Sequence, residues 1–340
     1  MSARATTDVG LLLPMVSTGR STREFLAEIE TEVLLAERSG LSVTLVPEHH
    51  HGPAAGLSDA LSVTGWLLAR TTTMRVGPGV LIAPLHHPVA LLERASILQH
   101  ASGDRLIMGV GAGYQPEDFA MFGKDVARRK ADFETVLRAW RSAADGAADI
   151  GAIPALPEAV PPLWVGAWSP SGVRLAARYG DLLLIDPIRS AAEIEHLIAV
   201  YRAECERCER LPRTALIRHF WVAETDEAAR REFAPTIEPI YRYYHRHGGL
   251  GATPDVAPGD LVLGGALDER VVCGAPETVL AQVGSLVELT GACAVIVSLR
   301  QPAGPSHEAV CRALSLFADQ VAPHLAGAVT TSPQATGRPR

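Results

Sequence analysis

Two extended apolar runs in the first half of the chain flank a single helical segment. The runs cover residues 75–83 and 105–110, and the segment between them begins at Pro88 and ends near Gly103. Proline is common at the first turn of a helix, and glycine commonly follows the last turn. Two strands joined by such a crossover helix lie parallel in one sheet. The pattern therefore predicts a βαβ unit, which restricts the chain to folds with a parallel sheet.

The second of these strands leads directly into a glycine-rich segment, Gly109-Val110-Gly111-Ala112-Gly113. Glycine has no side chain, so the backbone of such a segment can approach a ligand closely. In folds with parallel strands, ligands bind at the carboxyl ends of the strands. We therefore expect this segment to line a binding site.

The rest of the chain repeats the alternation of strand and helix. Capping boxes precede two of the predicted helices, Ser21 with Glu24 and Ser190 with Glu193. Further strands are predicted at residues 9–13, 41–46, 163–167, 182–185, 214–223 and 293–299. Eight strands that alternate with helices indicate an α/β fold of the (β/α)8 TIM-barrel class. A doubly wound open sheet is the alternative.

The alternation breaks between residues 225 and 271, after the seventh strand. This stretch holds a helical pattern interrupted by Pro235 and Pro239, an aromatic and basic cluster at residues 241–247, and a segment rich in glycine and proline. Long excursions of this kind in compact domains are commonly lids or mobile segments. We therefore expect an insertion here.

The aromatic and basic cluster of the insertion contains Tyr241, Tyr244 and His245. We expect these side chains to cover a substrate, while an ordinary amphipathic helix face is the alternative. Residues 1–326 are expected to form one barrel domain that includes the insertion. The tail at residues 327–340 has almost nothing to bury and is expected to be disordered.

The overall composition argues against several kinds of partner. The chain has 31 lysines and arginines and 38 aspartates and glutamates, which gives a net charge of −7 without a basic run. This balance argues against nucleic-acid binding. No apolar stretch reaches the about 18 residues of a membrane span, and the start lacks the pattern of a secretory signal, so we expect a cytoplasmic protein. Five scattered cysteines predict reduced thiols, including Cys205 and Cys208 in a helical pattern.

Polar side chains follow several of the predicted strands, and a barrel gathers such loops at one face. Glu48 and His49 follow the second strand, where a carboxylate can orient and tune an imidazole, so they are the catalytic candidates. His86 and His87 follow the third strand, and local hydrogen bonding is the alternative reading for them. Ser169 precedes a helix whose N-terminus can bind phosphate, although an ordinary helix cap has the same sequence.

Six stretches of the chain, taken in order, resemble those of one known family. They are LVPEHH, PLHHPV, GDRLIMGVGAGYQPEDFAMFG, LWVGAWSPSGVRLAARYGD, VCGAPETVL and TGACAVIVSL. Together they resemble the bacterial luciferase-like family of flavin-dependent monooxygenases, and the likeness spans nearly the whole chain. The resemblance favours the barrel over the open sheet.

The resemblance also implies roles for individual residues. It places Glu48 and His49 beside the isoalloxazine ring, with His49 as the acid/base or hydrogen-bonding group at the reactive flavin carbon. The FMN phosphate is expected at the N-terminus of the helix after Ser169. Gly79 and Val80 match a position under the flavin where the family often has a non-proline cis peptide bond or a bulge. The full set of implied cofactor positions is Gly79, Val80, Gly111, Ala112, Gly113, Tyr114, Trp168, Ser169, Ser171 and Gly172.

The activity that the resemblance implies is that of a two-component monooxygenase. Such an enzyme takes reduced FMN from a separate flavin reductase, reacts it with O2 to form a flavin C4a-hydroperoxide, and transfers one oxygen atom to an organic substrate. An apolar pocket with an aromatic lid would accept an aldehyde, a ketone or a fused aromatic compound. Tailoring of a natural product is one expectation, and a homodimer is the expected assembly.

One residue departs from the family's pattern. Many relatives carry an arginine where this chain has Ala112, and an arginine there can clamp the FMN phosphate. This departure keeps two alternatives open: a barrel that uses a deazaflavin coenzyme for hydride transfer, and a flavin-free subunit that stabilises a partner in a heterodimer. A metal-dependent hydrolase built on residues 48–51 is a further alternative, although the usual pair of metal ligands on the first strand is missing.

Overall fold

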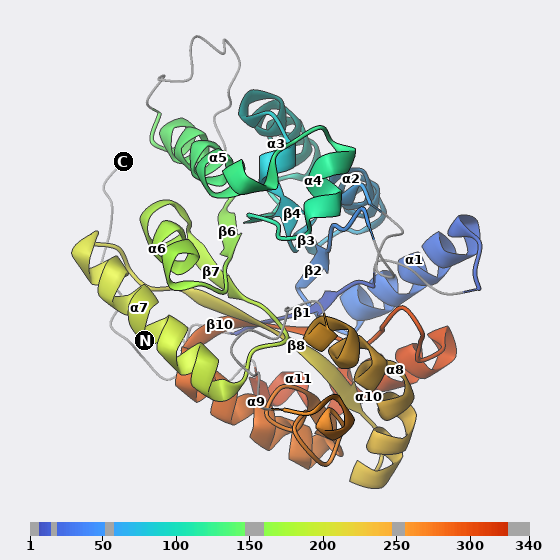
Figure 1. Ribbon diagram of the computed structural model, residues 1–340. Helices are drawn as coiled ribbons and strands as arrows, with labels where there is room; N and C mark the ends of the chain where they lie inside the picture. Colours follow the sequence, from blue (N-terminus) through green and yellow to red (C-terminus); the bar gives the residue numbers. More distant parts are fainter. Residues whose placement is uncertain (1–6, 15–18, 52–57, 147–159, 247–255, 326–340) are drawn as a thin grey trace, which may run out of the picture.

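The computed structural model describes residues 7–14, 19–51, 58–146, 160–246 and 256–325. Its strands lie at the centre and its helices surround them (Figure 1). The strands are β1 (Asp8–Leu12), β2 (Val43–Val46), β3 (Arg75–Pro78), β4 (Leu81–Ile82), β5 (Met108–Gly111), β6 (Leu163–Gly166), β7 (Leu182–Ile185), β8 (Thr214–Val222), β9 (Val272–Gly274) and β10 (Ala292–Ser298). Neighbouring strands are parallel and follow the order β3-β2-β1-β10-β8-β7-β6-β5-β4, while β9 pairs with β8 beside this path.

The two ends of this strand order belong to one stretch of chain, so the sheet closes on itself. β3 and β4 are separated only by Gly79 and Val80. Val76 of β3 forms a parallel bridge with Leu106, and the Ile107 N–H donates to the Val76 carbonyl oxygen at 3.0 Å. β4 then pairs with β5. The predicted TIM barrel is therefore confirmed, because a doubly wound sheet would keep two open edges.

The third barrel strand differs from the single run expected at residues 75–83. β3 ends at Pro78 and pairs with β2, whereas β4 begins at Leu81 and pairs with β5. A cis peptide bond joins Gly79 to Val80 between them. The cis bond that the family resemblance implied is thus present at this position.

Helices cover the outside of the barrel. Both predicted capping boxes are formed, at the starts of α1 and α7. The helices are α1 (Thr22–Arg38), α2 (Ala60–Arg70), α3 (Pro88–Ser102), α4 (Pro116–Met121), α5 (Arg129–Ala144), α6 (Pro170–Tyr179), α7 (Ala191–Arg207), α8 (Asp226–Arg246), α9 (Pro276–Thr290), α10 (His307–Gln320) and α11 (Ala322–Leu325). The crossover helix of the βαβ unit is α3, which ends at Gly103 with a left-handed φ of 65°.

The excursion after β8 is more regular than expected. The predicted interruption by Pro235 and Pro239 is wrong, because α8 runs continuously from Asp226 to Arg246. The two prolines are four residues apart on one exposed side of the helix, where water can hydrate the carbonyl groups that they leave unpaired. The opposite side buries Phe233 and Tyr241 against the barrel. The chain then returns to the sheet at β9.

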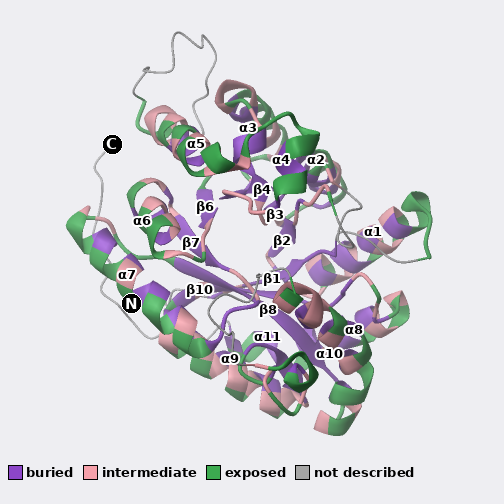
Figure 2. Ribbon diagram, viewed as in Figure 1, coloured by how far each residue is buried: buried purple, intermediate pink, exposed green. Residues whose placement is uncertain are grey.

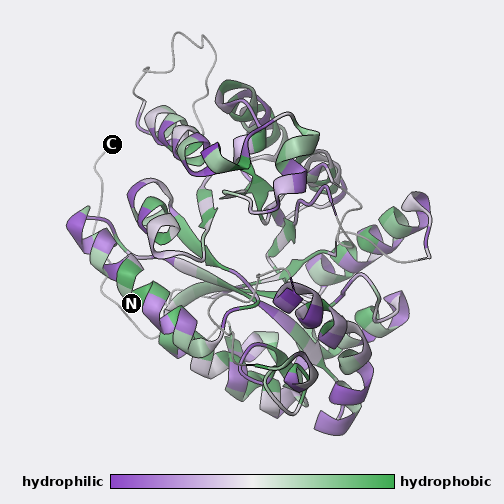
Figure 3. Ribbon diagram, in the orientation of Figure 1, coloured by the Kyte–Doolittle hydropathy of each residue, from purple (hydrophilic) through white to green (hydrophobic). Residues whose placement is uncertain are grey.

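Two apolar layers hold the fold together. A small cluster inside the barrel contains Leu45, Leu184 and Ile217, and a larger one fills the space between strands and helices. Figure 2 accordingly shows buried strands and helices with exposed outer sides. Figure 3 shows the apolar residues on the strands and on the inward sides of the helices. The inner cluster matters for function because several of its side chains also line the cavity described below.

The cysteines, possible membrane spans and long connections were also considered in the sequence. All five cysteines are free, with Cys205 buried in α7. Within the described ranges, no helix is long and apolar enough to cross a membrane. Parts of three predicted segments lie outside the described residues. They are residues 147–159 of the long connection expected at 142–162, residues 247–255 of the insertion, and the tail at 327–340.

Candidate active site

A cavity of about 850 Å3 lies at the carboxyl ends of the barrel strands. This volume falls within the range of small-molecule sites. Its walls come from the loops that follow successive strands: Glu48 and His49 after β2, residues 111–115 after β5, Trp168 after β6 and Asp186 after β7. The structure thus brings together the segments that the sequence placed at one face of a barrel.

The floor of the cavity is the turn between β3 and β4. The Val80 side chain fits against two glycines of neighbouring strands. A Cβ atom at Gly111 would lie 2.7 Å from Val80 Cγ2, and one at Gly166 would lie 2.9 Å from Val80 Cγ1. Real Cβ atoms do not approach carbon atoms this closely, so the packing of Val80 requires glycine at both positions. Gly79 and Val80 both line the cavity.

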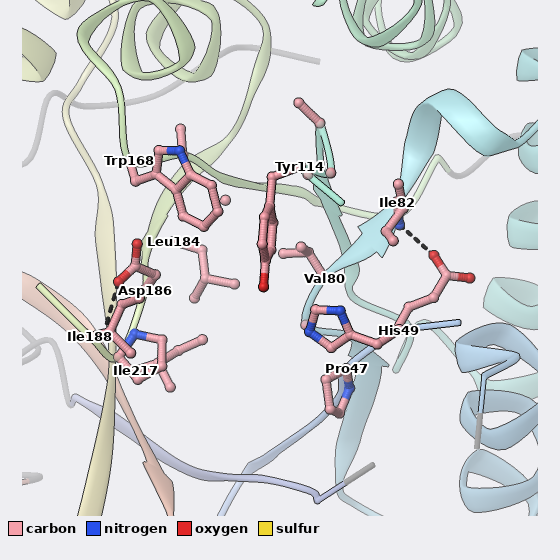
Figure 4. A pocket seen from close by; sticks show the side chains of 18 of the residues that line it. Pro47, His49, Val80, Ile82, Tyr114, Trp168, Leu184, Asp186, Ile188 and Ile217 are labelled. Carbon is pink, nitrogen blue, oxygen red and sulfur yellow. Dashed lines mark hydrogen bonds between the residues drawn. The ribbon is translucent and has the colours of Figure 1, made fainter. Parts of the chain in front are cut away.

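His49 projects into the cavity towards Val80 and Tyr114 (Figure 4). Its Nδ1 atom is buried and has no hydrogen-bond partner among the described residues. Burial lowers the pKa of His49, although the carboxylates of Asp118 and Glu48 oppose this effect. The imidazole is therefore neutral at pH 7. A buried polar atom without a partner is unfavourable by itself and indicates a place for a ligand.

Glu48 is buried beside His49 and contacts three neighbouring groups. Its carboxylate accepts a hydrogen bond from the Ile82 N–H, drawn as a dashed line in Figure 4, and lies 3.4 Å from His50 Nε2 and 3.6 Å from His86 Nε2. Burial opposes ionisation of Glu48, but these contacts outweigh it and hold its pKa below the usual value. Glu48 is thus a fixed negative charge that anchors the loop carrying His49.

Two aromatic side chains form another side of the cavity. The rings of Tyr114 and Trp168 meet edge to face with centroids 5.1 Å apart, and the Tyr114 ring lies 6.3 Å from the His49 ring. The Arg189 guanidinium lies over Trp168, 5.4 Å from its centroid. Trp168 is 39% exposed, which is unusual for so large an apolar side chain. These aromatic rings give the cavity apolar faces suited to a planar ligand.

The N-terminus of α6 opens into the cavity. Ser169 caps this helix by accepting a hydrogen bond from the Gly172 N–H at 3.2 Å, and its Oγ lies 3.3 Å from Ser171 Oγ. Pro170 has no N–H, so Ser171 carries the first amide of the helix that can reach a ligand. The amides and dipole of a helix N-terminus favour an anion. Ser169, Ser171 and Gly172 all line the cavity, so the residues expected to hold a phosphate lie together at this helix N-terminus.

Basic side chains that the sequence analysis did not single out line the same cavity. They are Arg129 and Lys130 at the start of α5, and Arg174 and Arg178 on α6. Arg178 is paired with Glu204 at 2.6 Å. Ala112 and Gly113 also line the cavity. Positive charge therefore reaches this region from two helices although position 112 carries none.

The residues expected in the lid have different places. Tyr244 lines the cavity, whereas Tyr241 and His245 are not among its lining residues. Tyr241 is fully buried, and its hydroxyl group lies 3.1 Å from His219 Nδ1. His219 itself lines the cavity. α8 therefore forms part of the cavity wall, with Tyr241 behind it.

Asp186 and His219 are further polar lining residues that were not anticipated from the sequence. Asp186 directly follows β7, so it could have been found, as Glu48 was, by looking for polar side chains that follow predicted strands. His219 lies inside β8, where side chains alternate between the two faces of the strand. Ile217, two residues earlier, lines the cavity as well. Identifying His219 as a lining residue would have required knowing which face of β8 points into the barrel.

The metal-site alternative concerns residues 48–51. In the part of the chain that the structure describes, no group of three or more histidine, cysteine, aspartate or glutamate side chains is arranged to hold a metal ion.

A family model described as luciferase-like monooxygenase matches residues 7–293. The chain belongs to this family. Among luciferase-like relatives, limonene 1,2-monooxygenase from Rhodococcus erythropolis is 27% identical over 314 residues, which cover 86% of this chain and 79% of that protein. The family assignment agrees with the motifs identified in the sequence and makes this protein a luciferase-like monooxygenase.

Solved structures share the luciferase-like fold. The oxygenating constituent of 3,6-diketocamphane monooxygenase from Pseudomonas putida, in complex with FMN, aligns with a TM-score of 0.73 and 18% identity, covering 93% of this chain and 98% of that one. Coenzyme F420-dependent tetrahydromethanopterin reductase from Methanopyrus kandleri aligns with a TM-score of 0.68 and 16% identity, covering 94% and 100%. At these identities the likeness establishes the barrel fold.

Proposed function

We propose that this luciferase-like protein is the oxygenase of a two-component monooxygenase, which uses reduced FMN and O2 to oxygenate an organic substrate. The observation that carries the proposal is the buried Nδ1 atom of His49, which faces the cavity and has no hydrogen-bond partner among the residues that the structure describes. The α6 N-terminus on the same cavity offers a place for the FMN phosphate. A formed cavity with these groups favours an enzyme over a flavin-free subunit.

The protein's own residues would bind and orient the cofactor and the substrate, and they would exclude water. Reduced FMN, when bound, supplies the activation of O2 that no side chain of this chain can provide. The neutral His49 can accept or return a proton at Nδ1, and the charged Glu48 keeps the loop of His49 in place. Val80, Tyr114 and Trp168 surround this position with apolar surface, which keeps water away from reactive species.

Two observations bear on the choice of cofactor. The basic side chains of α5 and α6 and the Ser171 amide can hold a phosphate although Ala112 replaces the family's arginine. This supports FMN, the ligand of the diketocamphane relative. The second candidate is hydride transfer with the deazaflavin coenzyme F420. The Methanopyrus neighbour, an F420-dependent enzyme with the same fold, supports this alternative.

Delivery of reduced FMN by a separate flavin reductase is part of the proposal. The diketocamphane neighbour is described as an oxygenating constituent, which is consistent with reduction on another protein. A homodimer and a role in natural-product tailoring stay predictions from the family resemblance.

Rapid mixing with oxygen tests the proposed activity. The protein is loaded with reduced FMN or, separately, reduced F420, and mixed with oxygenated buffer while absorbance is recorded. We expect a long-lived absorbing species with FMN before oxidised flavin appears. Failure to bind FMN, with circular dichroism showing a folded protein, would contradict the proposal. Binding of F420 alone would favour hydride transfer.

Replacement of His49 tests its role in the reaction. We expect His49→Ala to shorten the lifetime of the absorbing species or to lower product yield by about a hundredfold, because a positioned acid or base contributes at least this factor. FMN affinity should stay within about threefold of the parent value, since the proposed phosphate position is formed by α6 and not by His49. The exposed neighbour His51→Ala is the control. Unchanged turnover of His49→Ala would remove His49 from the mechanism.

A further inference from the structure

The wall opposite His49 is mostly apolar. Leu184, Ile188 and Ile217 lie on this side of the cavity, across from His49 and Val80 (Figure 4). They come from β7, the loop that follows it, and β8. Such a wall suits an apolar ring compound. Its polar groups are therefore few, and each one restricts what can bind.

Asp186 is one polar group of this wall. Its Oδ1 accepts a hydrogen bond from the Ile188 N–H at 2.9 Å, and its Oδ2 accepts one from Arg189 Nε at 3.1 Å. Each carboxylate oxygen can accept two hydrogen bonds, so each keeps capacity for one more. The side chain lines the cavity. Asp186 thus offers an acceptor to a ligand.

The charge of Asp186 is already balanced by its neighbours. Arg189 pairs with Asp186 and also with Glu193 at 3.2 Å, and Glu193 pairs with Arg270 at 2.8 Å. Two carboxylates and two guanidinium groups therefore alternate. The buried Arg218 adds a further positive charge nearby, and it acts with burial to lower the pKa of His219. No net negative charge is left to attract a cationic ligand.

His219 is the second polar group, and its ring contacts the Tyr241 hydroxyl. The Tyr241 oxygen lies 3.1 Å from His219 Nδ1 and 3.5 Å from the Pro187 carbonyl oxygen. Burial lowers the pKa of His219 to about 3, so the ring is neutral and its Nε2 donates or accepts one hydrogen bond according to the tautomer. A ligand hydroxyl group can both donate and accept, so it can pair with His219 in either tautomer.

We propose that this wall recognises a neutral, largely apolar ring compound through a hydroxyl group that donates to Asp186. The Asp186 carboxylate can only accept, so a ligand group without a hydrogen to donate would leave its remaining acceptor positions without a donor. Tyr244 and Trp168 add aromatic surface for a planar ring. The inference rests on the proposed function in taking this cavity as the substrate site, and it names a phenol or enol as the substrate class.

Binding of three matched probes tests this inference without any turnover. The probes are 2-naphthol, 2-methoxynaphthalene and the cationic 2-naphthylmethylamine, titrated calorimetrically into the protein with and without saturating oxidised FMN. We expect 2-naphthol to bind at least about tenfold more tightly than the methoxy compound, because the latter cannot donate a hydrogen bond to the Asp186 carboxylate. The amine should bind no more tightly than the methoxy compound. Equal affinity for the naphthol and the methoxy compound, or no binding of either, would overturn the inference.

Variants of Asp186 and His219 test where the hydroxyl group is recognised. The double variant Asp186→Asn with His219→Phe should reduce the preference for 2-naphthol to less than about threefold. Phe220→Leu is the control, because Phe220 is buried on the same strand but packs against Phe317 outside the cavity. It should keep the full preference. A folded double variant that also keeps it would overturn the inference.

The outcomes separate this inference from the proposed function. Preference for 2-naphthol without any oxygenated product from reduced FMN would support recognition of a hydroxyl group and contradict the monooxygenase proposal. Formation of the long-lived absorbing species with equal binding of both neutral probes would support the monooxygenase proposal and contradict recognition of a hydroxyl group.

Discussion

The adjacent residues Glu48 and His49 have opposite environments. Glu48 is charged and contacts its neighbours, whereas His49 is neutral and its Nδ1 atom has no hydrogen-bond partner in the described part of the chain. The first residue therefore orients the loop, and the second is left to meet a ligand. This division explains why a carboxylate and an imidazole stand side by side after β2.

The contact between His50 and Glu48 predicts a pH-dependent stability. It raises the pKa of His50 above 6.5. A histidine whose pKa rises on folding stabilises the folded state below its unfolded pKa, and this stabilisation is lost as the pH rises through the folded pKa. His50→Gln should therefore lower the free energy of unfolding by about 1 kcal/mol more at pH 6 than at pH 9. Urea denaturation at both values measures the difference.

The control for this prediction is His51→Gln, since His51 is exposed. Its effect should be small and equal at both values of pH. An effect of His50→Gln that is the same at pH 6 and pH 9 would show that the Glu48 contact contributes nothing to stability.

Single residues also show where sequence reasoning stops. Glu48, His49 and Ser169 follow strands, so their position at the mouth of a barrel could be predicted from the order of elements. The Arg189 contact with Trp168 could not, because these residues are distant in sequence. The same holds for the contact of His219 with Tyr241, which comes from another element and becomes a neighbour only in the folded chain.

Among the elements, the start of α6 combines a helix cap with a ligand position. Ser169→Ala should lower the free energy of unfolding by about 1 kcal/mol through loss of the cap. It should also weaken FMN binding, because the hydroxyl lies at the expected phosphate position. Ser21→Ala removes the cap of α1, which does not line the cavity. It should cost similar stability and leave FMN affinity unchanged, as fluorescence titration can measure. Equal FMN affinity in both variants would place the phosphate elsewhere.

The turn between β3 and β4 predicts a second effect at this scale. Gly111→Ala places a Cβ atom against Val80, so it should lower the free energy of unfolding by about 1–3 kcal/mol. Adding Val80→Ala removes the obstructing methyl groups and should recover part of the loss. Gly284 in α9 has open space around it, so Gly284→Ala should raise stability by up to about 1 kcal/mol. Thermal denaturation compares the four proteins. A double variant no more stable than Gly111→Ala would contradict the role of Val80.

α8 shows how burial overrides a local rule. Proline disfavours a helix interior, and residues 235 and 239 therefore predicted an interruption. This rule does not take into account which side of the helix faces water. Because both prolines face outward while Phe233 and Tyr241 are buried, packing on the barrel stabilises the continuous helix.

On the scale of the whole molecule, the alternation of strands and helices predicted a barrel or a doubly wound sheet, and the family resemblance favoured the barrel. The closure between β3 and β5 was not predictable, because it depends on pairing across the chain rather than on local pattern. α1 is likewise joined to α10 and to the segment before it by contacts of long sequence separation. Arg300, after β10, pairs with Glu32 at 2.8 Å and with Glu28, both of α1, while His307 of α10 lies 2.9 Å from Glu32.

This buried pairing predicts a large effect of one substitution. Arg300→Met should lower the free energy of unfolding by about 3–5 kcal/mol, because it leaves the carboxylates of Glu28 and Glu32 without their main partner. Arg138→Ala, which removes an exposed pair with Glu134, should change it by less than about 1 kcal/mol. Guanidinium chloride denaturation measures both. Effects of equal size would show that the buried network does not join the ends of the barrel.

The fit of Val80 between Gly111 and Gly166 restricts how this protein can diverge. Each glycine tolerates no side chain while valine is present, because the obstructing atoms belong to Val80. The three positions are therefore bound to change together, and their order of change matters. A lineage that first shortens residue 80 opens both neighbouring positions to alanine, whereas one that first enlarges residue 111 or 166 must pass through a destabilised intermediate.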